Sequence, residues 1–287
     1  MLYLLLASII WSASFALFKS ELASLDANLT AFLRLLLALV IFLPFFRTGR
    51  IPKKARLWFA LIGGIQYGLM YIMLNEAYQF LNGWQVALMT LFTPVYIVLM
   101  DSIWRKRLDM VFLLASFFAV AGAAIIITQE HALYAGSLKG CLLVQGADIC
   151  FALGLLMYRE HKLKIPETSD SELYALPYAG AVAVATVGTL FSGGFGQLAS
   201  LDVNQWMTLL YLGTISSGLC FFWWNKGATQ VSPVMLAAMS NLKVPLAVVV
   251  GLAVFGEDPG DLTRLIVGSI TMIVAIALAQ ERAKDIA

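Results

Sequence analysis

The sequence predicts an all-α protein that crosses a membrane about ten times. Hydrophobic residues make up 61% of the 287 residues and charged residues only 13%, whereas a soluble domain carries about 25% charged residues. The apolar residues also occur in long runs, such as 2–18 and 112–128, and about 20 mostly apolar residues suffice to span the hydrocarbon core. The ~10-residue alternating segments of a transmembrane β-barrel are missing.

Charge clusters, prolines and glycines divide the chain into ten candidate helices. The first stretch lacks the charged segment that begins a signal peptide, so we expect a true first span. Basic clusters at 47–56, 105–107 and 159–164 end the second, fourth and sixth spans, and the acidic loop 256–261 ends the ninth. No loop is long enough for a soluble domain, so the helices must carry the function. The expected spans are 2–19, 29–46, 57–80, 84–103, 109–128, 138–159, 173–192, 205–226, 232–255 and 262–280.

The distribution of Lys and Arg predicts the orientation. Cytoplasmic loops of membrane proteins carry an excess of basic residues. With the N-terminus inside, only Lys19, Lys139 and Arg264 lie on the outer side. We therefore expect both termini in the cytoplasm. The basic residues on the inner side are Arg47, Arg50, Lys53, Lys54, Arg56, Arg105, Lys106, Arg107, Arg159, Lys162, Lys164, Arg282 and Lys284.

The two halves of the sequence resemble each other at an offset of 150 residues. Gly68-Leu69 and Asn75 recur as Gly218-Leu219 and Asn225. Each half would hold five spans, an odd number, so the second copy must be inverted in the membrane. The expected units are 1–130 and 131–287. Inverted repeats around a site at the bilayer midplane are typical of secondary transporters. Further matches are Ala87 and Met89 with Ala237 and Met239, and, one residue out of step, Pro94 with Pro245.

The order and spacing of several motifs resemble the EamA branch of the drug/metabolite transporter superfamily. These motifs are Trp11-Ser-Ala-Ser-Phe followed by Lys19, Arg34 in the second span, and the helices with Pro94 and Pro245. The resemblance covers essentially the whole chain and implies transport of a small molecule across the bacterial inner membrane.

A closer resemblance within that branch is to the enterobacterial type of biotin transporter, which implies biotin uptake. It is carried by Gln66-Tyr-Gly-Leu-Met-Tyr71, Leu91-Phe-Thr-Pro-Val-Tyr-Ile97, Leu142-Leu-Val-Gln145 with Phe151-Ala-Leu-Gly154, and Asn225-Lys-Gly-Ala-Thr-Gln-Val231. The chain departs from that pattern at Asp148 and Lys243, where Asn and His are expected.

Ionisable residues inside the predicted spans are the first candidates for the substrate site. A charge at the bilayer centre costs about 2.5–3.5 kcal/mol even on the lenient insertion scale. Arg34, Glu76, Asp148, Lys226 and Lys243 lie in predicted spans. Lys226 is near a helix end, where its ammonium can reach the interface. Glu76 is either a proton site or a solvated carboxylate at the outer rim.

Asp148 and Lys243 lie about halfway along their spans. Lys243 precedes Pro245, which would free a backbone carbonyl, and its ammonium could receive a substrate carboxylate. Alternatively, the two residues form an ion pair without touching substrate. Arg34 could be a second anchor for a carboxylate through its planar fork of donors, or it could bind the outer interface.

Aromatic and polar residues would complete a pocket for a ring with an acid tail. Ligand sites combine apolar walls with a few hydrogen-bonding groups, although each residue alone could equally serve packing or an interhelical hydrogen bond. The candidates are Tyr67, Tyr71, Asn75, Tyr96, Gln145, Trp223 and Asn241.

Other functions have weaker support in the sequence. An intramembrane enzyme lacks a candidate site, because His131 and His161 fall in loops on opposite faces and no H-E-x-x-H motif is present. The P-loop motif is also missing. Cys141, Cys150 and Cys220 are expected to be structural thiols. We expect no cofactor, no metal and no nucleic-acid partner, and a monomer in contact with lipid. Export of amino acids or other amphipathic metabolites is the main alternative to uptake.

Overall fold

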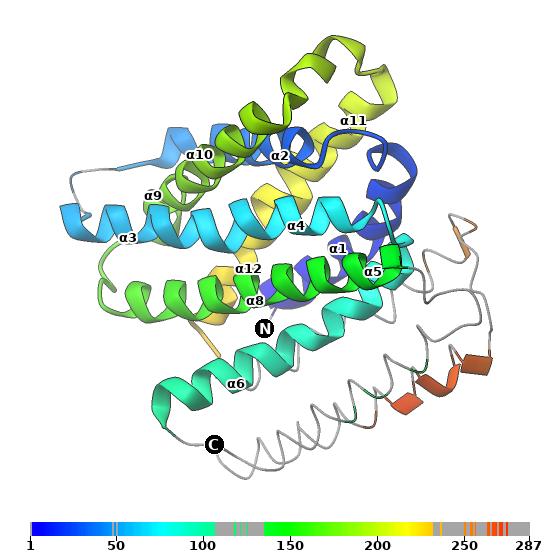
Figure 1. Cartoon of the computed structure of the whole chain (residues 1–287). Coiled ribbons are helices and arrows are strands. Elements are labelled where there is room, and N and C mark those ends of the chain that lie inside the picture. The colour runs from blue at the N-terminus through cyan, green and yellow to red at the C-terminus, as the bar shows by residue number, and fades with distance from the viewer. Residues whose placement is uncertain are drawn as a thin grey trace.

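The described part of the chain is a bundle of long helices (Figure 1). The computed structural model describes residues 2–47, 49, 51–106 and 135–231, with isolated positions between 118 and 274. These residues contain helices and no strand. Seven helical segments are long and apolar enough to cross a membrane, which agrees with seven of the ten predicted spans. The spans predicted at 109–128, 232–255 and 262–280 lie outside the described ranges.

Several spans are built from consecutive helical pieces that differ in their hydrogen-bond pattern. Single α-helices form the first two, with a short 3₁₀ turn after the second, whereas the third and seventh contain a π-helical piece and the fourth a 3₁₀ turn. In order, the seven spans are α1 (Leu2–Glu21); α2 (Ala27–Phe42) with η1 (Leu43–Phe45); α3 (Lys53–Gly63), η3 (Gly64–Leu69) and α4 (Met70–Ala77); α5 (Gly83–Met89), η4 (Thr90–Phe92) and α6 (Thr93–Arg105); α8 (Ala135–Leu163); α9 (Asp170–Leu173) with α10 (Ala175–Ser192); and α11 (Val203–Tyr211), η6 (Leu212–Leu219) and α12 (Cys220–Ala228), with η5 (Gly194–Ser200) between α10 and α11.

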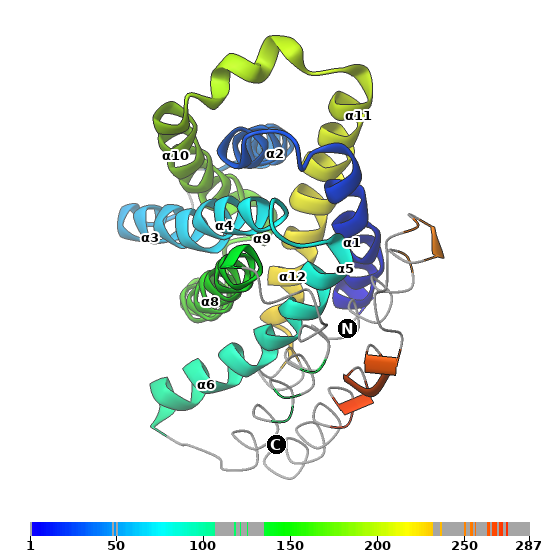
Figure 2. The ribbon, with the colours of Figure 1, turned by 45° about the vertical axis from the view of Figure 1, so that its right-hand side comes forward.

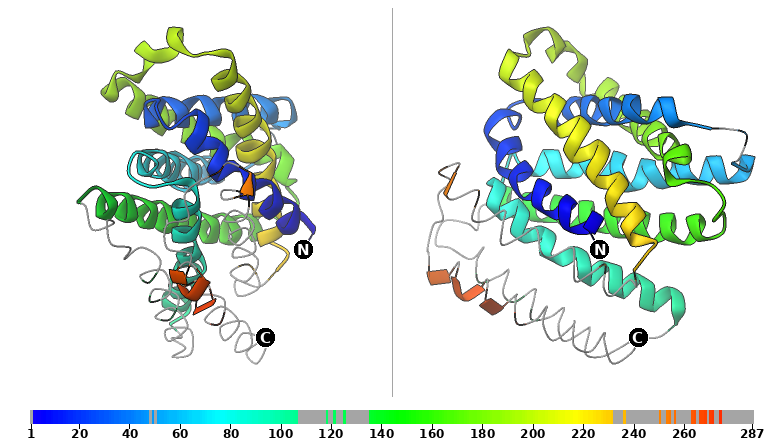
Figure 3. Two further views of the ribbon diagram at one scale, coloured as in Figure 1. Left: turned by 90° about the vertical axis from the view of Figure 1, so that its right-hand side faces the viewer. Right: turned by 180° about the vertical axis from the view of Figure 1, so that it is seen from behind.

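The spans of the two predicted halves interleave instead of forming separate bundles. Helix α10 packs on α2 and α3, η6 packs on α2, and α12 packs on α1. Helix α8 packs on α4 and α6. Figure 2 shows α1 beside the α11–α12 span, and Figure 3 shows the same pairing from behind. Residues from both halves therefore face each other in the interior.

The two ends of the bundle differ in charge. At one end the loop before α3 meets the start of α9, where Arg47 donates its backbone N–H to the carbonyl of Glu172. Arg105 also approaches Glu160 there (3.9 Å). We call this the basic end. It carries Arg47, Lys53, Lys54, Arg56, Arg105, Lys106, Arg159, Lys162 and Lys164.

Capping residues mark the helix starts at the other end, which we call the opposite end. Asp26 caps α2 by accepting the N–H of Leu29 at 2.8 Å. Capping boxes begin α5 at Asn82 and α11 at Asp202. Such caps satisfy backbone N–H groups that the first turn leaves without an intrahelical partner. They explain why the polar residues between these spans end one helix and begin the next.

Two π-helical pieces occupy matching places in the third and seventh spans. η3 ends at Leu69 and η6 at Leu219, 150 residues apart, the offset seen in the sequence. In each span an α-helix follows directly, α4 or α12. π-helical turns are rare and occur frequently at functional sites. The third and seventh spans thus share a local backbone distortion as well as a sequence pattern.

Glycines bring the third span against α10 at very short range. A Cβ on Gly63 would collide with the backbone of Pro177, and one on Gly180 with the backbone of Ala60. A Cβ on Gly154 would similarly collide with Gln66 on η3. Small residues allow close packing of membrane helices, so these glycines set the separation of three spans around the interior.

The close crossing predicts that Gly180→Val destabilises the fold. The added methyl groups must displace the backbone of Ala60, and overpacking of this kind costs about 1–3 kcal/mol. The melting temperature of the purified protein in detergent should fall by several degrees. Gly196→Val is the matched control, because nothing lies within 4 Å of a Cβ at Gly196. Equal melting temperatures for the two variants would contradict this packing.

Candidate functional site

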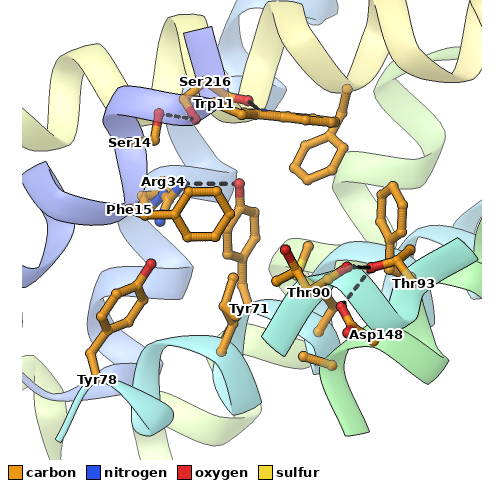
Figure 4. Close-up of a pocket in the computed structure, with 15 residues that line it drawn as sticks. Trp11, Ser14, Phe15, Arg34, Tyr71, Tyr78, Thr90, Thr93, Asp148 and Ser216 are labelled. Atoms are coloured by element: carbon orange, nitrogen blue, oxygen red, sulfur yellow. Dashed lines mark hydrogen bonds between the residues drawn. The ribbon is translucent and has the colours of Figure 1, made fainter. Parts of the chain in front are cut away.

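A cavity lies in the interior, between α1, α2, α4, the α5–α6 span, α8 and the η6–α12 span (Figure 4). It contains about 590 Å³ of space between the lining atoms, a volume that includes space open to the outside. Its lining comes from the middle of the spans and from their parts nearer the opposite end. The lining residues are Trp11, Ser14, Phe15, Arg34, Met70, Tyr71, Leu74, Tyr78, Thr90, Thr93, Ala147, Asp148, Phe151, Ser216 and Phe221.

Arg34 forms the cationic side of the cavity. It lies midway along α2 with only 5% of its surface exposed. Its Nη2 donates to the hydroxyl of Tyr71 (3.0 Å) and its Nε to Oγ of Ser217 (3.2 Å). Its guanidinium also lies over the Tyr71 ring, 4.2 Å from the centroid. The structure places Arg34 inside the bundle, and its expected role as an anchor for a carboxylate stays a prediction.

The partners of Arg34 among the described residues are all neutral. The hydroxyls of Tyr71 and Ser217 lie 2.8 Å apart and complete a triangle of hydrogen bonds with the guanidinium. The ion pairs in the described ranges are Arg105 with Asp101 and Glu160, Lys139 with Glu76, and Arg159 with Glu160. Among the described residues, no carboxylate pairs with the Arg34 guanidinium at the wall of this largely apolar cavity.

Asp148 forms the anionic side. It lies near the middle of α8, is 4% exposed, and its Oδ1 accepts a hydrogen bond from the Thr93 hydroxyl at 2.8 Å. Pro94 has no N–H, so the Thr90 carbonyl accepts instead from the backbone N–H and the hydroxyl of Thr93. The break caused by Pro94 thus places two threonines beside the carboxylate.

Aromatic rings line the space between the two charged sides. Trp11 packs on Phe221 with ring centroids 4.9 Å apart, and Phe151 lies edge-on to Trp11 at 6.4 Å. The indole N–H of Trp11 donates to the carbonyl of Ser216 at 2.8 Å. Since this N–H is satisfied, the ring presents an apolar face. The cavity therefore suits a molecule with an apolar middle and polar ends.

Three of the residues predicted from the sequence, Arg34, Tyr71 and Asp148, line this cavity. Tyr96 and Gln145 hydrogen-bond each other at 2.8 Å across α6 and α8 and lie outside the lining. Lys243 and Asn241 lie outside the described residues, so their roles remain predictions.

The other predicted residues lie elsewhere in the bundle. Asn75 is buried and donates to Thr30 Oγ1 (3.0 Å). Trp223 is half-buried on α12 and does not line the cavity. Glu76, the suggested proton site, lies at the opposite end and pairs with Lys139 at 3.4 Å, as a solvated rim carboxylate would.

A polar network involving Tyr67 closes the bundle between the cavity and the basic end. Gln66 and Asn225 exchange two amide hydrogen bonds of 2.9 and 3.2 Å. Asn225 also donates to the Tyr67 hydroxyl at 2.7 Å, which lies 2.7 Å from the Tyr174 hydroxyl. Tyr174 donates in turn to the carbonyl of Phe221 at 2.5 Å. The network joins the third, sixth and seventh spans, and each hydroxyl accepts one hydrogen bond and donates the next.

Comparison with known proteins assigns the chain to a family. The model of the EamA-like transporter family matches residues 1–128. A protein of Pseudomonas aeruginosa named as a probable biotin transporter is 33% identical over 282 residues, which cover 96% of each chain. The biotin transporter of Salmonella typhimurium is 34% identical over 265 residues, 90% of this chain and 86% of that protein.

The chain belongs to the EamA-like transporter family. It is a multi-pass membrane transporter and not an enzyme, as the sequence predicts. A solved crystal structure of 15% identity shares its fold, with a TM-score of 0.70 over 97% of this chain and 96% of that chain.

Sequence reasoning missed several residues at the cavity of this EamA transporter. Thr93 stands directly before Pro94. A proline within a span leaves the carbonyl four residues earlier without its helical N–H partner, and a hydroxyl next to the proline could have been expected to donate to that carbonyl, as Thr93 does to Thr90. Ser216 and Ser217 correspond to Gln66 and Tyr67 at the 150-residue offset, so the repeat already marked them. The contribution of Phe15 has no such signal, because any apolar helix contains phenylalanines.

The Gln66–Asn225 pair predicts a non-additive effect on stability. Asn225→Leu leaves the Gln66 amide buried without its partner, which costs about 1–3 kcal/mol. Gln66→Leu should cost a similar amount, and the double variant less than the sum, because residues in direct contact couple. Melting temperatures in detergent measure all three variants. Gln230→Leu, at an exposed position, is the control, and strict additivity would contradict the pairing.

Proposed function

We propose that this EamA transporter takes up biotin across the bacterial inner membrane, with the biotin carboxylate bound by Arg34. The observation that carries the proposal is the buried charge of Arg34, whose partners among the described residues are the neutral Tyr71 and Ser217. An anionic ligand in the cavity would compensate this charge. The names of the two bacterial relatives support biotin as the acid.

The chemistry of the guanidinium suits a carboxylate. Arginine offers five N–H donors in a rigid plane, and Arg34 makes two hydrogen bonds to described residues. Bidentate pairing with a carboxylate is stronger than a neutral hydrogen bond. The stacking of the guanidinium on the Tyr71 ring also fixes its plane before the ligand arrives. A preformed anchor reduces the entropy lost on binding.

The proposal predicts that Arg34→Gln weakens biotin binding about 10- to 150-fold, because hydrogen bonds to charged groups contribute about 1.5–3 kcal/mol. Binding of biotin and of its methyl ester to the purified protein in detergent is measured by calorimetry. The ester, which has no carboxylate, should bind weakly to wild type and be little changed by the substitution.

Arg105→Gln is the control, because Arg105 is exposed and lies outside the cavity. Arg34→Lys keeps the charge but not the fork and should fall between Arg34→Gln and wild type. A folded Arg34→Gln protein that binds biotin as tightly as wild type would refute the proposal.

We also propose that the chain holds ten spans in two inverted units, 1–130 and 131–287, with both termini in the cytoplasm. The matching π-helical pieces support the repeat. With the basic end inside, the Gln66–Asn225 network closes the cytoplasmic side, and the cavity lies toward the outside. Transport then requires this network to open while the outer side closes.

The repeat indicates which residues close the outer side. Asn225 is the sixth residue of α12, and Asn75 the sixth of α4. Asn225 contacts Gln66 and Tyr67, whose counterparts at the same offset are Ser216 and Ser217. The Oδ1 atom of Asn75 is buried and has no hydrogen-bond partner among the described residues. In the inward-open state, Asn75 would pair with these two serines, as Asn225 does now with Gln66 and Tyr67.

If Asn75 pairs with Ser216 and Ser217 in the inward-open state, the cysteines introduced by Asn75→Cys and Ser216→Cys can be cross-linked during transport. In a background without Cys141, Cys150 and Cys220, a short bifunctional maleimide should join the pair in proteoliposomes and stop biotin uptake. Thr214→Cys replaces Ser216→Cys in the control, because the half-buried Thr214 side chain donates a hydrogen bond to Leu210 of its own span instead of facing the other half. Equal cross-linking of both cysteine pairs, or no cross-linking of the Asn75→Cys and Ser216→Cys pair, would contradict the proposed pairing of Asn75 with the two serines.

A further inference from the structure

Two basic residues each join the ends of two spans, one at either end of the bundle. Lys19, in the last turn of α1, donates to the backbone carbonyl of Tyr78 at the end of α4 (2.6 Å). Arg159, near the end of α8, donates to the carbonyl of Ala228, the last residue of α12 (3.2 Å). The last carbonyls of a helix lack intrahelical donors and lie at the negative end of its dipole, so a cation is favourable there. We call these two hydrogen bonds the end contacts.

The end contacts occupy corresponding places in the two proposed halves of the chain. Tyr78 and Ala228 are related by the offset of 150 residues, and Lys19 and Arg159 by an offset of 140. In each half, a basic residue at the end of the first span therefore binds the end of the third span. These spans are α1 and α3–α4 in the first half, and α8 and α11–α12 in the second.

A second pair of contacts supports the offset of 140 residues for the first spans. Ser14 of α1 donates to Oγ of Ser216 in η6 at 3.0 Å. The counterparts of these two residues are Gly154 of α8, at the offset of 140, and Gln66 of η3, at the offset of 150. They are also in direct contact, because a Cβ on Gly154 would collide with Gln66. The two first spans thus meet the π-helical pieces of the other half at matching positions.

The match between the halves distinguishes contacts that persist from contacts that change during transport. In a transporter built from inverted repeats, one half rocks against the other around a fixed site, and the inward-open state follows when the two halves exchange their conformations. A contact that both halves make in one state is then made in both states. The end contacts are of this kind. By contrast, Asn225 contacts Gln66 and Tyr67 in the present state, whereas its counterpart Asn75 donates to Thr30.

We propose that Lys19 and Arg159 are positioning residues for transport, which keep the first and third spans of each half joined at one end throughout the cycle. The inference rests on the two inverted units proposed above. Trp11 of α1 and Tyr71 of α4 both line the cavity (Figure 4), and the Phe18 ring packs on the Tyr78 ring beside the end contact, with centroids 4.5 Å apart. Because these two spans are joined at the opposite end, they turn about that end when the cavity opens toward the basic end.

Cross-linking tests whether an end contact persists when the state of the transporter changes. Gln79 follows Tyr78, and its side-chain amide donates to the carbonyl of Ala23, just after α1. Ala23→Cys with Gln79→Cys therefore reports the end contact from outside the cavity lining. The pair is introduced into the full-length protein without its native cysteines and treated with a short bifunctional maleimide. The yield of cross-linked peptide is measured by mass spectrometry.

Asn225→Leu breaks the network that closes the basic end and should shift the protein toward the inward-open state. It should raise the cross-linking yield of the Asn75→Cys and Ser216→Cys pair and leave the yield of the Ala23→Cys and Gln79→Cys pair unchanged. Gln66→Leu replaces Asn225→Leu if that variant does not fold. An end-contact yield that changes with the state refutes the inference. An unchanged yield of the Asn75→Cys pair also refutes it, because the halves would then not exchange conformations.

Loss of an end contact should slow transport without weakening binding. Lys19→Gln should lower biotin uptake into proteoliposomes by about 2- to 30-fold, according to how strongly the cation binds the helix end. Biotin binding in detergent should stay unchanged, because Lys19 lies outside the cavity lining. Lys19→Arg keeps a cation and should retain most of the uptake. Lys139→Gln is the matched control, because Lys139 lies at the same end but pairs with Glu76 at 3.4 Å.

A covalent link in place of the end contact separates positioning from a general effect on folding. Cross-linking of the Ala23→Cys and Gln79→Cys pair should restore uptake in the Lys19→Gln protein and leave it intact in the protein that keeps Lys19. Uptake that stops on cross-linking, or that is not restored, refutes the inference. The cross-linking yields require no substrate, so they test the end contacts independently of the proposed function. That function fails instead if the purified wild type neither binds nor takes up biotin.

Discussion

A single buried arginine charge, midway along one of the helices long and apolar enough to span a membrane, constrains the rest of this structure. Moving a charged side chain to the bilayer centre costs several kcal/mol unless its surroundings compensate. Arg34 is compensated by the Tyr71 and Ser217 hydroxyls and by the face of the Tyr71 ring. These groups come from the third and seventh spans, whereas Arg34 lies on the second, so the charge is accommodated where spans from both halves of the sequence meet.

The π-helical pieces are part of that accommodation. Tyr71 stands just after η3, and Ser217 lies within η6, so each partner of Arg34 depends on the local winding of its span. A π turn rotates the residues that follow it relative to a regular α-helix. The first of these pieces, η3, also carries Gln66 and Tyr67, which close the bundle toward the basic end. The cationic side of the cavity and the closing network are therefore linked through η3.

Close packing makes the linkage rigid. Gly63 and Gly180 bring the third span against α10 with no room for a Cβ, and Gly154 does the same for α8 against η3. Membrane helices gain little from the hydrophobic effect among themselves, and they associate through such contacts and through interhelical hydrogen bonds. The third span is thus packed directly against α8, which carries Asp148, and against α10, which begins directly after Tyr174.

The sequence by itself determined the class of protein, the seven described spans to within a few residues at most ends, and the family. These properties depend on the composition, on the lengths of the apolar runs and on the order of the charged residues. All three can be read along the chain without knowing which segments contact each other. It also singled out Arg34, Tyr71 and Asp148, because charged or polar residues in an apolar span stand out. Only the tertiary structure decided that Tyr67 belongs to the closing network while Tyr71 contacts Arg34, although both lie in one motif. Only the structure showed that Thr93, Ser216 and Ser217 complete the two sides of the cavity. Which face of a span meets which neighbour depends on the π turns and on the glycine contacts, and both arise from packing between distant segments that no local pattern records.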